Sequence, residues 1–117
     1  MSKLEDFDFY CDVALKPDAE IKKVYEDDKI LAYHHTKPFW EMHIVIIPKE
    51  HTWDVRTVEN PQLFADIMTV AQNILKEIPQ EELDEKGAKI LTNIGKFQDT
   101  PHLHVHVAMG DQIREPM

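Results

Sequence analysis

The chain is poor in the features that disulfide-bonded and membrane-embedded proteins need. Cys11 is the only cysteine in 117 residues, so neither an intrachain disulfide nor a cluster of cysteine metal ligands can form. No apolar run approaches the roughly 20 residues that a membrane-spanning helix requires. The first residues lack the basic start and the apolar stretch of a signal peptide. We therefore expect a cytoplasmic protein with no membrane partner.

Basic residues are scarce as well. The chain has 13 Lys and Arg against 22 Asp and Glu, which gives a formal net charge of −9. A charge of this sign opposes long-range attraction of polyanions, so we expect no nucleic-acid polymer as a partner. A phosphate-bearing small molecule must instead be held by local donors, namely backbone amides, amide side chains and histidines. The charge therefore favours a compact ligand pocket.

The remaining composition is that of one globular domain. Hydrophobic residues make up 43% and charged residues 30% of the chain, and there are only 3 Gly. The sequence contains no internal repeat, no low-complexity tract and no Gly/Ser linker. We therefore expect a single domain over residues 1–117. A chain this short often completes its core by pairing with a copy of itself.

Several short segments rich in β-branched and aromatic residues predict strands. Two of them flank the polar turn 27–29 and form a candidate hairpin, and a third is a buried run stopped by Pro48. The five predicted strands are Lys22–Glu26, Ile30–Thr36, His43–Ile47, Lys89–Ile94 and His102–Met109.

One segment between the third and fourth predicted strands has the periodicity of an amphipathic helix. Asn60 is a good N-cap, Pro61 suits the first helical position, and Pro79 ends the helix. Apolar residues recur between them at spacings of three and four. The acidic segment Glu81–Glu85 is predicted to be a solvated connection. The order of strands, helix and strands favours an antiparallel α+β fold over a doubly wound parallel sheet.

The last predicted strand carries three alternating histidines. His102, His104 and His106 would point to one face of a strand at intervals of about 6.6 Å, with apolar side chains on the other face. A single histidine in a strand is usually a half-exposed polar residue. Three adjacent rings repel one another whenever they are protonated, so a purely structural role is a poor explanation for them. The pattern indicates a functional site.

Two chemistries can use such a face. Alternate histidines can supply nitrogen ligands to zinc or a similar ion. Alternatively, one neutral imidazole can act as the nucleophile of a phosphoryl or nucleotidyl transfer while the others orient it and bind phosphate. The local spacing does not choose between them.

The wider sequence resembles the histidine-triad (HIT) family, and within it the Hint-like branch of nucleotide hydrolases and transferases. Residues 102–108 match the pattern His-x-His-x-His-x-x, and segments 23–28 and 43–51 occur in the family's order and approximate spacing, as do Asn93 and Gly95. Residues 1–22 match only loosely. The resemblance implies a five-stranded antiparallel sheet with one long helix and a short N-terminal helix, assembled as a two-fold homodimer.

The resemblance also implies a mechanism that requires no metal or other cofactor. His104 would attack the α-phosphorus of a nucleoside phosphoramidate or related nucleotide conjugate, and water would cleave the resulting nucleotidyl-imidazole. His102 and the upstream His43 would support the orientation of His104. His106 would lie beside the phosphate and the leaving group, where it offsets developing charge or assists proton transfer.

Four further residues are predicted on the substrate side. Asn93 and Gln98 carry neutral donors that suit an anion. Asp99 stands where the family has a hydroxyl, and His35 stands where nucleotide-binding relatives place an aspartate for the ribose. These two departures motivate a second hypothesis, in which the chain is a nucleotide- or metabolite-binding protein with weak catalysis. A metal-dependent His-x-His enzyme is the third.

Overall fold

The sheet is built around two hydrophobic strands, β2 (Ile30–His34) and β3 (Trp40–Pro48), which are antiparallel. Most residues on both faces of these strands are buried, as expected for the centre of a sheet. Asp27 shapes the turn that precedes β2. Its Oδ1 accepts hydrogen bonds from the backbone N–H groups of Lys29 at 2.7 Å and Ile30 at 2.8 Å.

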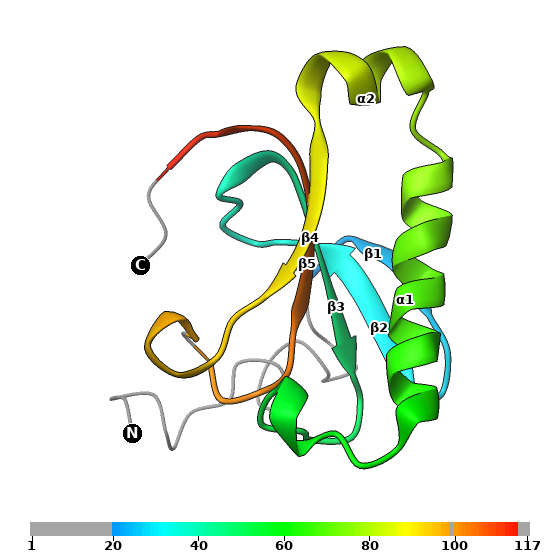
Figure 1. Ribbon diagram of the computed structural model, residues 1–117, viewed down its shortest axis with the longest axis vertical. Coiled ribbons are helices and arrows are strands. Elements are labelled where there is room, and N and C mark those ends of the chain that lie inside the picture. The colour runs from blue at the N-terminus through cyan, green and yellow to red at the C-terminus, as the bar shows by residue number, and fades with distance from the viewer. Residues whose placement is uncertain (1–19, 99, 115–117) are drawn as a thin grey trace.

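Three more strands complete the sheet in the computed structural model, which describes residues 20–98 and 100–114. They are β1 (Lys23–Glu26), β4 (Ala88–Thr92) and β5 (Val105–Gln112). The strand order is β1-β2-β3-β5-β4 with every neighbouring pair antiparallel (Figure 1). The predicted five-stranded antiparallel α+β fold is therefore confirmed. The short N-terminal helix that was expected falls in residues 1–19, outside the described residues.

The predicted long helix is α1 (Pro61–Lys76), which covers one face of the sheet (Figure 1). Its N-terminus is set by Asn60, whose side chain accepts a hydrogen bond from the Gln62 backbone N–H at 3.0 Å. Its buried residues pack with the sheet residues of that face in one hydrophobic cluster. The buried members are Ile30, Ala32, Ile44, Ile46, Ile67, Val70, Ala71, Leu103, Val105 and Val107.

The opposite face of the sheet has a second, smaller apolar cluster. It consists of Leu31 and Tyr33 of β2 and Val45 and Ile47 of β3, with Ile21 packed against it. Side chains alternate between faces along a strand, so residues at odd positions of β2 and β3 share this face. The candidate site lies on it.

The acidic segment predicted as a connection is instead a helix, α2 (Gln80–Lys86). That prediction was wrong because Glu has a good helix propensity, and Glu81 and Glu82 lie in the first turn, where negative charge is favoured. Gln80 also donates to Asp84 one turn later at 2.8 Å. No helix within residues 20–98 and 100–114 is long and apolar enough to cross a membrane.

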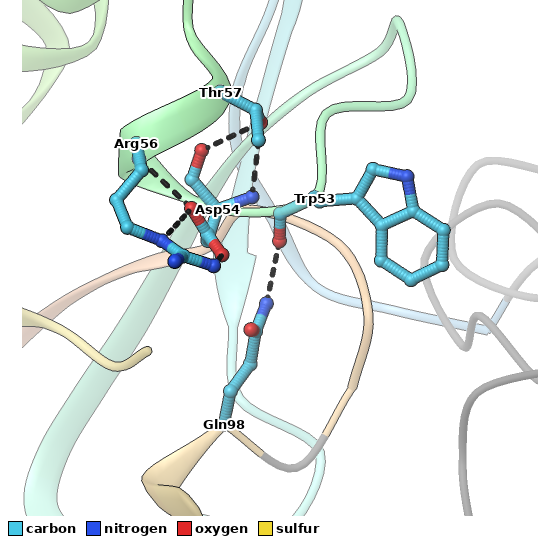
Figure 2. A network of polar contacts seen from close by, with 5 residues as sticks. All are labelled: Trp53, Asp54, Arg56, Thr57 and Gln98. Atoms are coloured by element: carbon cyan, nitrogen blue, oxygen red, sulfur yellow. Dashed lines mark hydrogen bonds and ion pairs between the residues drawn. The ribbon is translucent and has the colours of Figure 1, made fainter. Parts of the chain in front are cut away.

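A short 3-10 turn, η2 (Val55–Thr57), joins β3 to α1 through a network centred on buried Asp54. The Asp54 carboxylate accepts from the Arg56 side chain at 2.8 and 3.2 Å and from the Arg56 backbone N–H at 2.8 Å (Figure 2). The Thr57 hydroxyl donates to the Asp54 carbonyl at 2.9 Å. Sequence reasoning did not single out this network, although Asp54 and Thr57 have the three-residue spacing of a capping box.

We expect Asn60→Ala to lower the free energy of unfolding by about 1 kcal/mol, because one N–H at the helix N-terminus loses its acceptor. Asn73→Ala is the matched control, since Asn73 is exposed within α1 and Ala favours helix there. Urea denaturation of both variants measures the difference. Equal stability of the two variants would contradict the assigned cap.

The Asp54 network predicts a pH-dependent contribution to stability. The hydrogen bond from the Arg56 side chain holds the pKa of the Asp54 carboxyl below its ordinary value of 3.8. A lowered carboxyl pKa stabilises the fold above the ordinary value, and this stabilisation is lost as pH falls through the lowered pKa. Asp54→Asn keeps a capping oxygen but cannot ionise.

Unfolding free energies of the wild type and Asp54→Asn should therefore differ most near neutral pH and converge as pH falls below 3.8. Arg56→Met should flatten the pH dependence in the same way, because it removes the guanidinium that lowers the pKa. A gap of constant size across that acid range would rule out the assigned role of the ion pair.

Candidate active site

Four histidine rings form a row on the sheet face opposite α1. Val45 belongs to the apolar cluster on this face. His43 of β3 lies two residues before Val45, and His106 of β5 is paired with Val45, so both histidines share its face. The ring centroids of His43 and His106 are 4.9 Å apart, and those of His106 and His104 are also 4.9 Å apart. His35, just beyond β2, stacks on His43 with centroids 4.4 Å apart. Four predicted site residues are thus brought together.

The hydrogen bond of His104 determines which of its nitrogens carries hydrogen. His104 Nδ1 lies 2.6 Å from the backbone carbonyl oxygen of His102. A carbonyl oxygen can only accept, so Nδ1 is the protonated nitrogen and Nε2 of the neutral ring bears a lone pair. The Thr92 hydroxyl donates to the His104 carbonyl at 2.8 Å and fixes the backbone beside β4. The ring is 2% exposed, so its orientation is set by the protein.

His102 is placed differently from the predicted strand geometry. β5 begins at Val105, so His102 and His104 precede the strand and the expectation of a continuous strand from His102 was wrong. The reason is that the preceding backbone bonds elsewhere: the Leu103 N–H donates to the Thr52 carbonyl, outside the β-ladder. The His102 ring turns to the end of β3, where its Nε2 donates to the Pro48 carbonyl at 2.9 Å.

The hydrogen bond between His43 and His106 also has a defined direction. The Phe39 backbone N–H lies 3.0 Å from His43 Nδ1, and a backbone N–H can only donate. His43 Nδ1 is therefore unprotonated, and Nε2 of the neutral ring donates to His106 Nδ1 at 2.7 Å. The proton of His106 then lies on its own Nε2. The face thus combines a nucleophilic lone pair on His104 with a hydrogen-bond donor on His106.

Two of the four predicted substrate-side residues, Asn93 and Gln98, lie in loop segments that follow β4. Asn93 is half-buried directly after β4, and Gln98 follows the 3-10 turn η3 (Gly95–Phe97). The Gln98 side-chain N–H donates to the Trp53 carbonyl at 2.6 Å, which ties this loop to the loop that carries Asp54 (Figure 2). Asp99 lies outside the described residues.

A cavity of about 580 Å³ opens between these two loops. Its lining combines an indole, two cationic side chains and an amide with residues of the capped turn η2. Sequence reasoning did not identify this cavity. The lining residues are Trp53, Asp54, Arg56, Thr57, Gly95, Lys96 and Gln98. A cavity of this size can hold part of a small ligand.

The hydrogen-bonding pattern constrains metal binding by the triad. His102 Nε2 and His104 Nδ1 carry hydrogen in their bonds to backbone carbonyls, so these two atoms cannot act as ligands in this arrangement. Within the described part of the chain, no group of three or more His, Cys, Asp or Glu side chains is arranged to hold a metal ion.

Comparisons with known proteins agree with this fold. An uncharacterized HIT-like protein of Helicobacter pylori is 30% identical over 92 residues, which cover 77% of this chain and 85% of that protein. A 14 kDa zinc-binding protein of Zea mays is 28% identical over 118 residues, covering 99% of this chain and 92% of that protein.

A solved structure of a HIT family hydrolase from Clostridium thermocellum superposes with a TM-score of 0.76 at 26% identity. The match covers 94% of this chain and 96% of that one, and supports a hydrolase-type enzyme. The family model described as HIT domain matches residues 16–113, which include all the described histidines. The chain is a member of the histidine-triad family.

Proposed function

We propose that the chain hydrolyses a nucleoside phosphoramidate or a related nucleotide conjugate through a covalent nucleotidyl-His104 intermediate. The observation that carries this proposal is the 2.6 Å bond between His104 Nδ1 and the His102 carbonyl, which leaves a lone pair on Nε2. An imidazole nucleophile must present an unprotonated nitrogen to phosphorus. His104 meets this requirement through backbone geometry, without a metal or another cofactor.

In the first step, the Nε2 lone pair of His104 forms a bond to the α-phosphorus. The bond from phosphorus to the leaving nitrogen or oxygen breaks with its electron pair, and a proton from solvent completes the leaving group. His106 Nε2–H donates a hydrogen bond that offsets the charge developing there. Water then displaces Nε2 from phosphorus and releases the nucleoside monophosphate. The proton lost by that water balances the one taken up earlier.

The attack also changes the charge of His104. A ring that bears hydrogen on Nδ1 and phosphorus on Nε2 is cationic, so its bond to the His102 carbonyl strengthens as the reaction proceeds. An interaction that strengthens toward the transition state accelerates the chemical step. His102 therefore contributes through its backbone, while its own ring is held by Pro48.

Substrate recognition is proposed to use Asn93, Gln98 and Asp99 near the phosphate and leaving group, and His35 near the ribose. His35 Nδ1 accepts from the Lys37 N–H at 3.0 Å, so the proton of a neutral His35 ring lies on Nε2. The His35 N–H is a hydrogen-bond donor, so it suits substrate groups that accept, whereas an aspartate at this position would suit groups that donate. We place the activity in the cytoplasm, on small nucleotide-like molecules rather than nucleic-acid polymers or membranes.

The covalent step predicts a trapped adduct. With adenosine phosphoramidate, acid-quenched mass spectrometry should find one nucleoside monophosphate on the peptide that contains His104. His104→Ala should show no adduct and lose activity by at least about 10³-fold, because the nucleophile is absent. His34→Ala is the control, since His34 is an exposed histidine at the end of β2 and on the other face.

Failure of the wild type to turn over any conjugate faster than His104→Ala would reject hydrolysis. Tight binding of a nucleoside monophosphate in calorimetry, with no adduct, would then favour the weakly catalytic binding protein.

We also propose a homodimer formed across α1 and β4. β4 is an edge strand of the sheet, so its outer backbone groups can pair with a second copy. Large apolar side chains are exposed beside it: Phe64 is 39%, Met68 48% and Ile90 38% exposed. Met68 and Ile90 line one surface hollow together, which joins the helix and the strand into one apolar surface.

The proposed dimer surface predicts that Met68→Lys/Ile90→Lys converts a dimer into a monomer, because two charges would be buried at the contact. Sedimentation equilibrium measures the mass. Val24→Lys is the matched control, because Val24 is 40% exposed on the opposite edge strand and should leave the dimer intact. A wild type that sediments as a monomer at micromolar concentration contradicts the proposed dimer.

A further inference from the structure

The last two described residues hold the connection between β2 and β3 by its backbone. Arg114 donates from Nη2 to the Lys37 carbonyl at 3.0 Å and from Nε to the Pro38 carbonyl at 3.2 Å. The Ile113 N–H donates to the Phe39 carbonyl at 2.7 Å. Three successive carbonyls are thus engaged, and the guanidinium lies 4.5 Å from the centroid of the Phe39 ring. In Figure 1 the red C-terminal segment runs beside this teal connection.

The N–H groups of the same connection engage the histidine row. Lys37 donates to His35 Nδ1 and Phe39 donates to His43 Nδ1, both at 3.0 Å. Pro38 between them has no N–H. Residues 37–39 therefore act as a strap whose carbonyls bond to the C-terminal segment and whose N–H groups bond to two stacked imidazoles.

The position of the strap controls the tautomers of His43 and His106, which are linked to the Phe39 N–H by successive hydrogen bonds. If the Phe39 N–H turns away, His43 Nδ1 loses the donor that keeps it unprotonated, and its proton is no longer confined to Nε2. His106 Nδ1 then loses its defined donor, and the proton of His106 can lie on either nitrogen. The buried Phe39 and His43 make this bond insensitive to solvent competition.

We infer that Arg114 is a positioning residue, which acts through the strap to keep His43 hydrogenated on Nε2 and His106 as the donor toward the leaving group. A planar guanidinium is suited to this role because two of its N–H groups meet two neighbouring carbonyls at once, which a lysine ammonium does not reproduce. The catalytic consequence rests on the proposed function. The tautomeric consequence concerns the protein alone.

The tautomers are measured by two-bond nitrogen–proton correlation spectra of the protein with ¹⁵N-labelled histidine, without substrate. In the wild type, His43 and His106 should each show hydrogen on Nε2. Arg114→Met should shift both rings toward mixed tautomers, and Arg114→Lys should fall between. Guanidinium ion added to Arg114→Ala should restore the wild-type pattern. Unchanged His43 and His106 spectra in Arg114→Met would overturn the inference.

Lys89→Met is the matched control, because the Lys89 ammonium lies 4.8 Å from the centroid of the Trp40 ring, beside Phe39, yet has no bond to the strap among the described contacts. Its spectra should match the wild type, whereas the same tautomer change as in Arg114→Met would overturn the inference.

On adenosine phosphoramidate, Arg114→Met should lower kcat about tenfold and leave KM within about twofold, because orientation rather than binding is lost. A raised KM with unchanged kcat would also overturn the inference, because substrate binding rather than orientation would then be lost. If even the wild type fails to turn over, the proposed function fails while the spectra still decide the role of Arg114.

Discussion

The site depends on the fact that a backbone carbonyl can only accept a hydrogen bond and a backbone N–H can only donate one. An imidazole can do either with each nitrogen, so an isolated histidine has no fixed direction. Here the His102 carbonyl bonds to His104 and the Phe39 N–H bonds to His43. His104 Nε2 therefore bears a lone pair, whereas His43 donates to His106 Nδ1 and leaves the hydrogen of His106 on its Nε2. The proposed nucleophilic attack and leaving-group stabilisation require these two opposite characters.

The sheet separates stability from chemistry by using its two faces differently. One face packs under α1 in an apolar cluster, and the other carries the row of histidines beside a smaller cluster. Because His43 and His106 stand on the paired central strands β3 and β5, the spacing of these two rings is fixed by the β-ladder. His35 and His104 lie just outside the strand ends. Outside the sheet, Gln98 bonds to Trp53 between two loops, and both residues line the cavity there.

Local sequence patterns predicted most of the framework. The buried run of β3, the cap and periodicity of α1, and the alternation of histidines that leads into β5 are all patterns of neighbouring residues. The start of β5 was misplaced because the alternation continues through His102 after the backbone has left the β-ladder. The role of Arg114 was invisible for a different reason: it contacts a carbonyl 77 residues away, and only the folded sheet brings the two together.

Neutron diffraction on deuterium-exchanged crystals at neutral pH can test these tautomers, because it locates hydrogen on each ring nitrogen. We expect deuterium on His104 Nδ1 facing the His102 carbonyl, none on His104 Nε2, and deuterium on Nε2 of both His43 and His106. Deuterium on His104 Nε2 would rule out His104 as the nucleophile, since that nitrogen would then have no lone pair to offer phosphorus.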